Sequence, residues 1–227
     1  MPSVLITGAN RGLGLEFARQ YAAEGWRVIA CSREPSRAHA LQALKGNIER
    51  HALDVTDNLS IGTLITSLGQ APIDVLLLNA GVHLQKDCSL DELNASLWLK
   101  EFEINTIAPL MLARRLADNV TRSDLRRVVA ISSGSASLTN MKGGGNYAYR
   151  AGKAALNAGM RMLAADLAPR GITVVPIAPG HTRTDMGGAE APYPVEDSVT
   201  RVRGAIARLT FKDSGSFLSR DGTPLPW

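Results

Sequence analysis

The chain has 227 residues, of which 45% are hydrophobic and 20% charged, with a formal net charge of +4. This length fits one α/β domain with a sizeable core, so we expect residues 1–227 to form a single domain. The small net charge disfavours a nucleic-acid-binding protein, because no aromatic pattern accompanies the arginines at Arg114, Arg115, Arg122, Arg126 and Arg127.

Cysteine usage and hydropathy point to a reducing compartment. Cys31 and Cys88 are the only cysteines, and no metal-like Cys/His spacing surrounds them, so we expect two free thiols and no metal. Met1 runs directly into the first apolar segment, which is not the pattern of a signal peptide. Apolar runs such as Val75–Leu78 are too short to span a membrane. These features predict a cytoplasmic protein without a membrane partner.

Along the chain, short apolar runs alternate with segments of helical spacing. The runs are Val4–Ile6, Arg27–Cys31, Ile48–Leu53, Val75–Leu78, Val128–Ser132 and Ile172–Ile177, and the helical segments are 13–24, 35–44, 58–68, 97–118 and 147–168. Most runs are β-branched without polar alternation, which is typical of strands buried on both faces of a parallel sheet. We therefore predict an α/β, doubly wound Rossmann fold with helices on both faces. A late strand near Gly215–Leu218 completes the sheet, and residues 181–200 read as a loop or lid.

Polar or glycine-rich residues follow each predicted strand. In an open α/β sheet, ligands bind outside the carboxyl ends of the strands, so these residues should gather at one site. In chain order they are Gly8 to Gly14, Ser32-Arg33, Asp54-Val55, Asn79-Ala80-Gly81, Ser132-Ser133 and Pro179-Gly180.

The segment Thr7-Gly8-Ala9-Asn10-Arg11-Gly12-Leu13-Gly14 lies between the first strand and the first helix. Strand, glycine-rich turn and helix form the context in which a glycine motif predicts a dinucleotide site. Glycines let backbone N–H groups approach a pyrophosphate at a helix N-terminus, where the helix dipole favours negative charge.

Tyr149 and Lys153 are four residues apart, so one helix face presents both. An ammonium beside a phenol favours the phenolate, and we expect it to lower the tyrosine pKa and allow proton exchange with a carbonyl or alcohol oxygen. Taken alone, the pair is more often an aromatic–lysine pair on the surface, but the glycine-rich motif and the strand that ends in two serines favour the catalytic interpretation. Ser133, just past a strand, is the first choice for a hydroxyl that binds the substrate oxygen, with Ser135 and Ser137 as alternatives.

Other residues yield weaker hypotheses. No Gly-x-Ser-x-Gly elbow followed by a histidine is present, which disfavours a hydrolase. His39 and His51 suit surface or loop positions, whereas His83 and His181 follow strands and are candidates to line the pocket.

These motifs, in order and over essentially the whole chain, resemble those of the short-chain dehydrogenase/reductase family in its compact single-domain form. The matching residues are Thr7-Gly8-x-x-x-Gly12-x-Gly14, Asn79-Ala80-Gly81, Asn105, Ser133, Tyr149-x-x-x-Lys153 and Pro179-Gly180. Residues 147–150, 184–188 and 221–227 are similar to those of the Sniffer/C-factor-like carbonyl reductases.

The resemblance implies roles for individual residues. Tyr149 is the acid/base, Lys153 binds the nicotinamide ribose and tunes Tyr149, Ser133 orients the carbonyl, and Asn105 supports a proton relay. The cofactor would be NADP(H), and the substrate a small carbonyl compound. Its cofactor-binding residues would be Gly8, Asn10, Arg11, Gly12, Leu13, Gly14, Ser32, Arg33, Asp54, Val55, Asn79, Ala80, Gly81, Tyr149, Lys153, Pro179, Gly180, Thr182 and Thr184. Relatives often dimerise through the helices that carry Asn105 and Tyr149. The apolar stretch Ile107–Leu112 suits such a homodimer, the alternative being that it forms ordinary core.

The choice of NADP over NAD rests on the end of the second strand. An NAD-binding protein commonly has a carboxylate there, whereas this chain has Cys31-Ser32-Arg33 with no acid before Glu34. Ser32 can donate to a 2′-phosphate, and Arg33 and Arg11 can pair with it.

The sequence therefore predicts an NADPH-dependent carbonyl reductase, the alternative being an NADP-binding signalling or sensor protein with little turnover. One departure from the family pattern concerns the interval from Ser133 to Tyr149, which is longer than in many members. We place the extra residues at Gly143-Gly144-Gly145, which leaves the choice among Ser133, Ser135 and Ser137 open.

Overall fold

A computed structural model describes all 227 residues. Seven parallel strands form one sheet in the order β3-β2-β1-β4-β5-β6-β7, and the strand order reverses between β1 and β4. The strands are β1 (Ser3–Thr7), β2 (Arg27–Ser32), β3 (Ile48–Ala52), β4 (Val75–Leu78), β5 (Arg127–Ile131), β6 (Thr173–Ala178) and β7 (Leu218–Ser219). This order confirms the predicted doubly wound fold.

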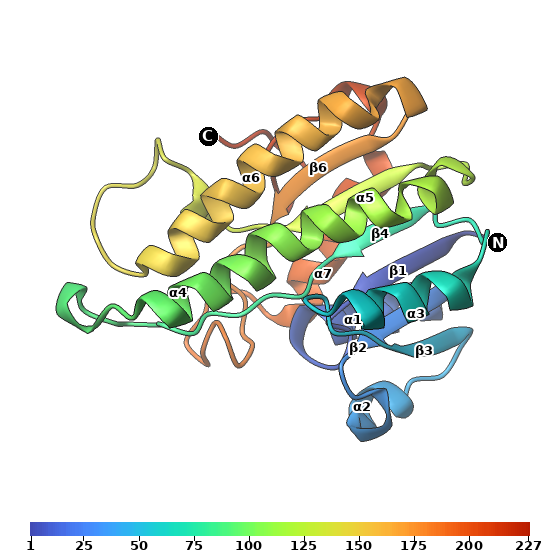
Figure 1. Cartoon of the computed structure of the whole chain (residues 1–227), viewed down its shortest axis with the longest axis horizontal. Helices are drawn as coiled ribbons and strands as arrows, with labels where there is room; N and C mark the ends of the chain where they lie inside the picture. Colours follow the sequence, from blue (N-terminus) through green and yellow to red (C-terminus); the bar gives the residue numbers. More distant parts are fainter.

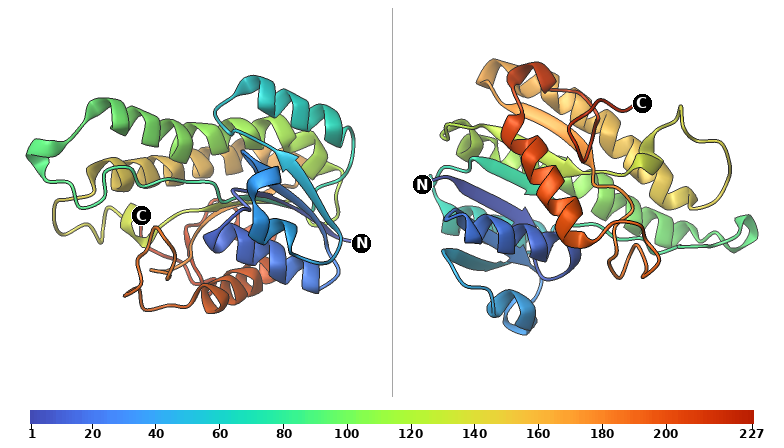
Figure 2. Two further views of the ribbon diagram at one scale, coloured as in Figure 1. Left: turned by 90° about the horizontal axis from the view of Figure 1, so that it is seen from below. Right: turned by 180° about the vertical axis from the view of Figure 1, so that it is seen from behind.

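Helices cover both faces of the sheet. They are α1 (Gly12–Ala23), α2 (His39–Gln42), α3 (Asn58–Leu68), α4 (Ala95–Phe102), α5 (Ala108–Thr121), α6 (Tyr147–Leu167) and α7 (Val195–Arg208). Helices α4, α5 and α6 lie across the near face in Figure 1, and α1 and α7 cover the opposite face in the rear view of Figure 2. Short helical turns occupy Pro35–Arg37, Leu90–Glu92, Gly134–Ala136, Ala168–Arg170 and Phe211–Asp213.

The hydrophobic core is divided by the sheet into two layers. Because successive strand side chains point to opposite faces, Leu5 packs toward α3, α5 and α6, whereas Val4 and Ile6 pack toward α1 and α7. Strands β1 and β4 are buried along their whole length, as the unbroken apolar runs predict. The edge strand β3 is half-exposed and carries charged residues instead.

Three sequence-based predictions about elements are wrong. The helix predicted over 97–118 is interrupted by a π-helical segment, Glu103–Ile107, between α4 and α5. The helix predicted over 35–44 is reduced to one turn and the four-residue α2, because proline begins the segment and Leu41 is the only buried side chain of α2. The loop predicted over 181–200 ends at Pro194, because α7 begins at Val195.

Helix α7 was detectable in the sequence. Its buried residues Val199, Val202 and Ile206 are spaced as on one helix face, and Glu196 and Asp197 lie in its first turn, where acidic side chains favour the helix dipole. The glycines and prolines just before it masked this pattern. The last strand, β7, has two residues and begins at Leu218 rather than at Gly215.

Candidate active site

The glycine-rich segment forms a tight turn between β1 and α1. Gly8 and Gly12 have φ angles of 69° and 53°, a backbone region that other residues rarely adopt. A Cβ atom on Gly14 would lie 2.1 Å from the carbonyl oxygen of Gly8, so only glycine allows this close approach. The first turn of α1 contains no acidic residue, and Arg11 before it gives no side-chain cap. The N–H groups of α1 are therefore available to an anion.

Asn79 holds this turn in place from the end of β4. Its side-chain Nδ2 donates to the carbonyl oxygens of Thr7, at 2.9 Å, and Gly8, at 3.3 Å. The Thr7 hydroxyl in turn accepts from the backbone N–H groups of Asn79 and Ala80. Asn79 thus shapes the glycine turn directly.

The residues that follow β2 and β3 lie at the same edge of the sheet as the glycine turn, because these strands run parallel to β1 in the same sheet. Ser32 is buried, and its Oγ has no hydrogen-bond partner, whereas Arg33 is exposed. A phosphate would reach Ser32 only after the hydroxyl turns outward. Asp54 accepts from the backbone and hydroxyl of Thr56, and these hydrogen bonds keep the pKa of Asp54 below its ordinary value. Val55, next to it, is half-buried.

Tyr149 and Lys153 lie one turn apart near the start of α6, on the face that meets the end of β5. Lys153 is 5% exposed, and its Nζ donates to the carbonyl oxygen of Ile131 at 2.8 Å. Nζ lies 5.9 Å from the centroid of the Tyr149 ring. The spacing in the sequence thus becomes a phenol with a buried amine behind it.

The pKa of Tyr149 differs from the sequence-based expectation. Burial raises it above its ordinary value, and a hydrogen bond with the Ser133 side chain opposes part of that rise. The expected lowering by Lys153 does not occur, because the Lys153 amine is turned to the strand carbonyl and is itself desolvated. Burial lowers the pKa of Lys153 to about 8. Tyr149 is therefore protonated at neutral pH, which suits a proton donor.

The three candidate serines occupy different environments. Ser133 is half-buried, and its side chain interacts with the Tyr149 hydroxyl. Ser135 is exposed, and Ser137 is buried with its hydroxyl 3.5 Å from a terminal oxygen of Trp227. Ser132 donates to Asn157 on α6 at 2.6 Å and so faces the helices. Ser133 is the one placed beside Tyr149.

Asn105 lies in the π-helical segment between α4 and α5 and is 1% exposed. Its side chain binds both backbone groups of Val82, accepting from the N–H and donating to the carbonyl at 2.8 Å each. Gly81 packs against Asn105, and a Cβ there would lie 3.1 Å from Asn105 Oδ1 and 3.7 Å from Lys153 Nζ. Single π-turns in α-helices are frequent at functional sites.

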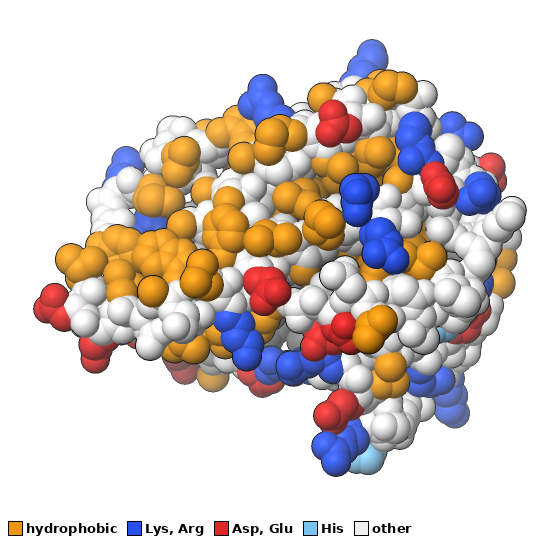
Figure 3. Space-filling view, viewed as in Figure 1, with side chains coloured by type: hydrophobic (Ala, Val, Ile, Leu, Met, Phe, Trp, Pro, Cys, Tyr) orange, Lys and Arg blue, Asp and Glu red, His pale blue; other side chains and the backbone are white.

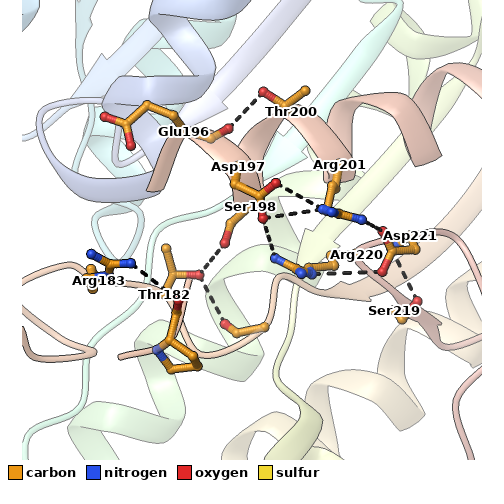
Figure 4. Close-up of polar contacts among 12 residues, drawn as sticks. Thr182, Arg183, Glu196, Asp197, Ser198, Thr200, Arg201, Ser219, Arg220 and Asp221 are labelled. Carbon is orange, nitrogen blue, oxygen red and sulfur yellow. Dashed lines mark hydrogen bonds and ion pairs between the residues drawn. The ribbon is translucent and has the colours of Figure 1, made fainter. Parts of the chain in front are cut away.

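The segment after β6 closes the site from the side opposite α4. Pro179 is buried and Gly180 exposed, and Thr182 Oγ1 lies 3.1 Å from Gly180 O and 2.9 Å from Ser198 Oγ, with one proton to donate to either of them. In Figure 4 this contact adjoins a network in which Arg220 and Arg201 both bind Asp197. The Thr182–Ser198 contact ties the loop to α7, and the network ties Arg220, in the segment after β7, to the same helix.

The same segment approaches the glycine turn. Thr184 lies 3.5 Å from the position of a Cβ on Gly12, and Asp185 pairs with Arg11 at 2.8 Å. Arg11, predicted to bind phosphate, is thus paired with a carboxylate in this structure. Asn10, beside it, is exposed, and Leu13 is half-buried.

Three residues that the motifs do not specify also surround Tyr149. The His83 ring stacks on the Tyr149 ring, with centroids 4.5 Å apart. Asn146, directly before α6, binds His83. Glu101 is fully buried and accepts from the Leu84 N–H at 2.9 Å, and burial raises its pKa. Only the position of His83 after a strand could have indicated one of these residues.

The outer face of α4, α5 and α6 is apolar. Figure 3 shows hydrophobic side chains gathered over these helices, and the exposed ones include Leu97, Leu99, Ile107, Met111 and Met162. Of the stretch Ile107–Leu112 proposed for dimerisation, Ile107 and Met111 are exposed whereas Leu112 is core. The homodimer stays a prediction. No helix is both long and apolar enough to traverse a bilayer.

Comparison with known proteins gives consistent matches. A family model described as short chain dehydrogenase matches residues 2–193. The protein C-signal of Myxococcus xanthus is 38% identical over 162 residues, which cover 71% of this chain and 97% of that protein.

Solved structures match over the full chain. The carbonyl reductase Sniffer of D. melanogaster is 31% identical with a TM-score of 0.91, and the match covers 100% of both chains. An NADPH-bound carbonyl reductase from chicken fatty liver is 30% identical with a TM-score of 0.92, covering 100% of this chain and 99% of the other. These matches confirm the family and fold expected from the sequence motifs.

Proposed function

The chain belongs to the short-chain dehydrogenase family, and from this premise we propose that it is an NADPH-dependent carbonyl reductase. The observation that carries the proposal is the grouping of Ser133, Tyr149 and buried Lys153 at the sheet edge that also holds the glycine turn. The substrate is a ketone or aldehyde, reduced to the alcohol. One domain, residues 1–227, provides both the cofactor site and the chemistry.

The residues at the sheet edge fit a nicotinamide dinucleotide. The Gly8–Gly14 turn leaves a cradle that a Cβ on Gly14 would fill, and the free N–H groups of α1 suit its phosphates. Asn79, Ala80 and Gly81 line the path from this turn to Lys153, and Thr182 and Thr184 border it from the loop after β6. Bound NADPH supplies the hydride for the carbonyl carbon.

Tyr149 supplies the proton. Its hydroxyl, protonated at neutral pH, donates to the carbonyl oxygen as negative charge develops there. Ser133 donates a second hydrogen bond to the same oxygen and fixes its direction. Lys153 has two N–H donors beyond the one used by Ile131, and these would hold the cofactor ribose.

Tyr149→Phe tests this assignment. We expect turnover to fall about a hundredfold to ten-thousandfold, because only the proton donor is lost, while cofactor binding is retained. Tyr147→Phe is the matched control, since Tyr147 lies two residues away and its hydroxyl faces Gly144. Turnover of carbonyl substrates would be measured by NADPH oxidation. Tyr149→Phe activity within a few-fold of the parent, or above that of Tyr147→Phe, contradicts the role.

Cofactor choice is a separate proposal. Arg33, exposed after β2, provides positive charge for a 2′-phosphate, and no carboxylate precedes Glu34 to repel it. Arg11 in the glycine turn adds to this charge when a phosphate replaces Asp185 as its partner. We expect at least a tenfold preference for NADPH, or about 1.4 kcal/mol. Arg11→Ala and Arg33→Ala should each weaken NADPH binding more than NADH binding in fluorescence titrations. Equal affinity of the parent for both cofactors would refute this.

One comparison favours a second candidate. The match to a protein named C-signal suggests an NADP-binding signalling or sensor protein with little turnover. The two candidates differ in catalysis, because a sensor binds the cofactor without needing Tyr149 as a proton donor. A carbonyl panel that yields NADPH binding and no NADPH oxidation would favour the sensor over the reductase.

A further inference from the structure

His83 lies directly on the proposed proton donor. The imidazole and the Tyr149 ring are stacked, with centroids 4.5 Å apart and planes inclined by 26°. His83 is half-buried in the loop that follows β4, so part of its ring remains open. An aromatic stack of this kind fixes the imidazole next to the group that the substrate carbonyl must reach.

The hydrogen bonds of Asn146 determine which imidazole nitrogen carries the proton. Asn146 Oδ1 accepts from the backbone N–H of Asp87 at 3.3 Å and lies 3.1 Å from His83 Nε2. A backbone N–H can only donate, so the Asn146 atom between these groups is the oxygen. His83 Nε2 must therefore be the donor, which leaves Nδ1 of the neutral ring as an acceptor.

The backbone of this arrangement is held in an uncommon conformation. Asn146 and Asp87 have φ angles of 51° and 57°, in the left-handed region that non-glycine residues seldom occupy. Asn146 immediately precedes Tyr147, the first residue of α6, so its contacts couple the His83 loop to the helix of Tyr149. Residues in such conformations persist where the surrounding contacts hold them, and they cluster at functional sites.

His83 Nδ1 has no partner within the protein. This nitrogen makes no hydrogen bond and is not fully buried, so it is open to a ligand. Burial lowers the pKa of His83, although the Asn146 hydrogen bond opposes this, so the ring is neutral at neutral pH. The charged groups that act on it are Lys86 and Asp87 from its own loop, and Tyr149 faces it from α6.

We propose, on the premise that the chain is a carbonyl reductase, that His83 selects substrates with a hydrogen-bond donor on the carbon next to the carbonyl. A carbonyl oxygen that binds the Tyr149 hydroxyl brings the neighbouring substituent alongside the imidazole, because the two rings are stacked. An α-hydroxyl group there donates to Nδ1. The preferred substrates are α-hydroxy ketones and aldehydes, and the products are vicinal diols.

Matched substrates isolate this hydrogen bond. The set is 3-hydroxybutan-2-one, 3-methoxybutan-2-one and butan-2-one, with 2-hydroxyacetophenone, 2-methoxyacetophenone and acetophenone as a larger set. The methoxy ketones keep the electron-withdrawing oxygen, lose the donor and add one methyl group, so the same ratio in His83→Phe shows how much of the difference is steric. We expect kcat/KM with NADPH to be about threefold to tenfold higher for the hydroxy than for the methoxy ketone, as one net hydrogen bond allows.

Two variants remove the acceptor in different ways. His83→Phe keeps the ring stack and should bring the hydroxy-to-methoxy ratio to near one, while butan-2-one or acetophenone is still reduced. Asn146→Gly keeps the left-handed backbone but frees the imidazole, so the ratio should fall part of the way. If circular dichroism shows that His83→Phe does not fold, the hydroxy-to-methoxy ratio of Asn146→Gly is used to test the role of His83 instead.

The outcomes separate this inference from the proposed function. If the parent protein reduces none of these carbonyl compounds with NADPH, the proposed reductase function itself is contradicted. A parent that reduces the methoxy ketones or unsubstituted ketones as well as the hydroxy ketones overturns the role of His83 and leaves the reductase standing. The role of His83 is likewise overturned if the hydroxy-to-methoxy ratio of His83→Phe equals that of the parent. If His83→Phe does not fold, an unchanged ratio in Asn146→Gly has the same meaning.

Discussion

Lys153 is held in the core at a cost in stability, and replacing it should make the protein more stable and inactive. The side chain is 5% exposed, and its one protein partner is the carbonyl oxygen of Ile131. Burial lowers its pKa from 10.5 to about 8, although Glu101 acts in the opposite direction. Lys153→Met keeps the length of the side chain and removes the charge.

The magnitude follows from the pKa. One pKa unit corresponds to about 1.4 kcal/mol, so the charged form of Lys153 destabilises the folded protein by about 3 kcal/mol below pH 8. Loss of the hydrogen bond to Ile131 offsets about 1 kcal/mol. The variant should gain about 2 kcal/mol, which raises Tm by roughly 4–8 °C for a domain of this size. The attraction between Lys153 and Glu101 is already part of this pKa, so its loss in the variant adds no further cost.

The effect must depend on pH in one direction. Lys153 has its ordinary pKa of 10.5 in the unfolded chain and about 8 in the folded one, so between these values the unfolded state binds more protons. The stability of the parent therefore rises with pH across this window, whereas Lys153→Met lacks this contribution. The advantage of the variant is full below pH 8 and disappears toward pH 10.5.

Urea unfolding of the cofactor-free protein at pH 7, 8, 9 and 10 measures this difference. Lys212→Met is the control, because Lys212 is exposed and its replacement should leave stability nearly unchanged at every pH. The reasoning is refuted if Lys153→Met is less stable than the parent at pH 7, or if the difference is constant from pH 7 to 10.

Three further changes have defined outcomes. Gly14→Ala should abolish cofactor binding in titrations and lower Tm, because its Cβ would lie 2.1 Å from Gly8 O. The control Gly62→Ala, in α3, has nothing within 4 Å of the new Cβ and should raise the free energy of unfolding by about 0.5–1 kcal/mol. Equal Tm values for the two variants would contradict the close packing at Gly14. Glu101→Gln should move the acidic limb of the kcat/KM profile for alcohol oxidation to lower pH, because the ionised carboxyl raises the pKa of Tyr149; a shift to higher pH would exclude this. Asp57→Ala should cost about 1 kcal/mol in urea unfolding, because Asp57 caps α3 through Leu59 and Ser60, and no loss would show that water replaces the cap.

The sequence by itself determined the sheet and the placement of the motifs. Runs such as Val75–Leu78 are apolar at every position, and only a strand covered on both faces buries them all, so the strands and their alternation with helices follow from local pattern. The i, i+4 spacing of Tyr149 and Lys153 required one helix face. The glycines at 8, 12 and 14 required a turn that side chains would block.

Tertiary structure decided which groups surround Tyr149 and how they are charged. His83, Glu101 and Asn146 come from three separate segments, and no spacing in the sequence predicts that they meet. The expected lowering of the Tyr149 pKa was wrong for the same reason. Spacing sets which residues share a face, whereas a pKa depends on desolvation and on the orientation of each donor, and these exist only once the layers have packed.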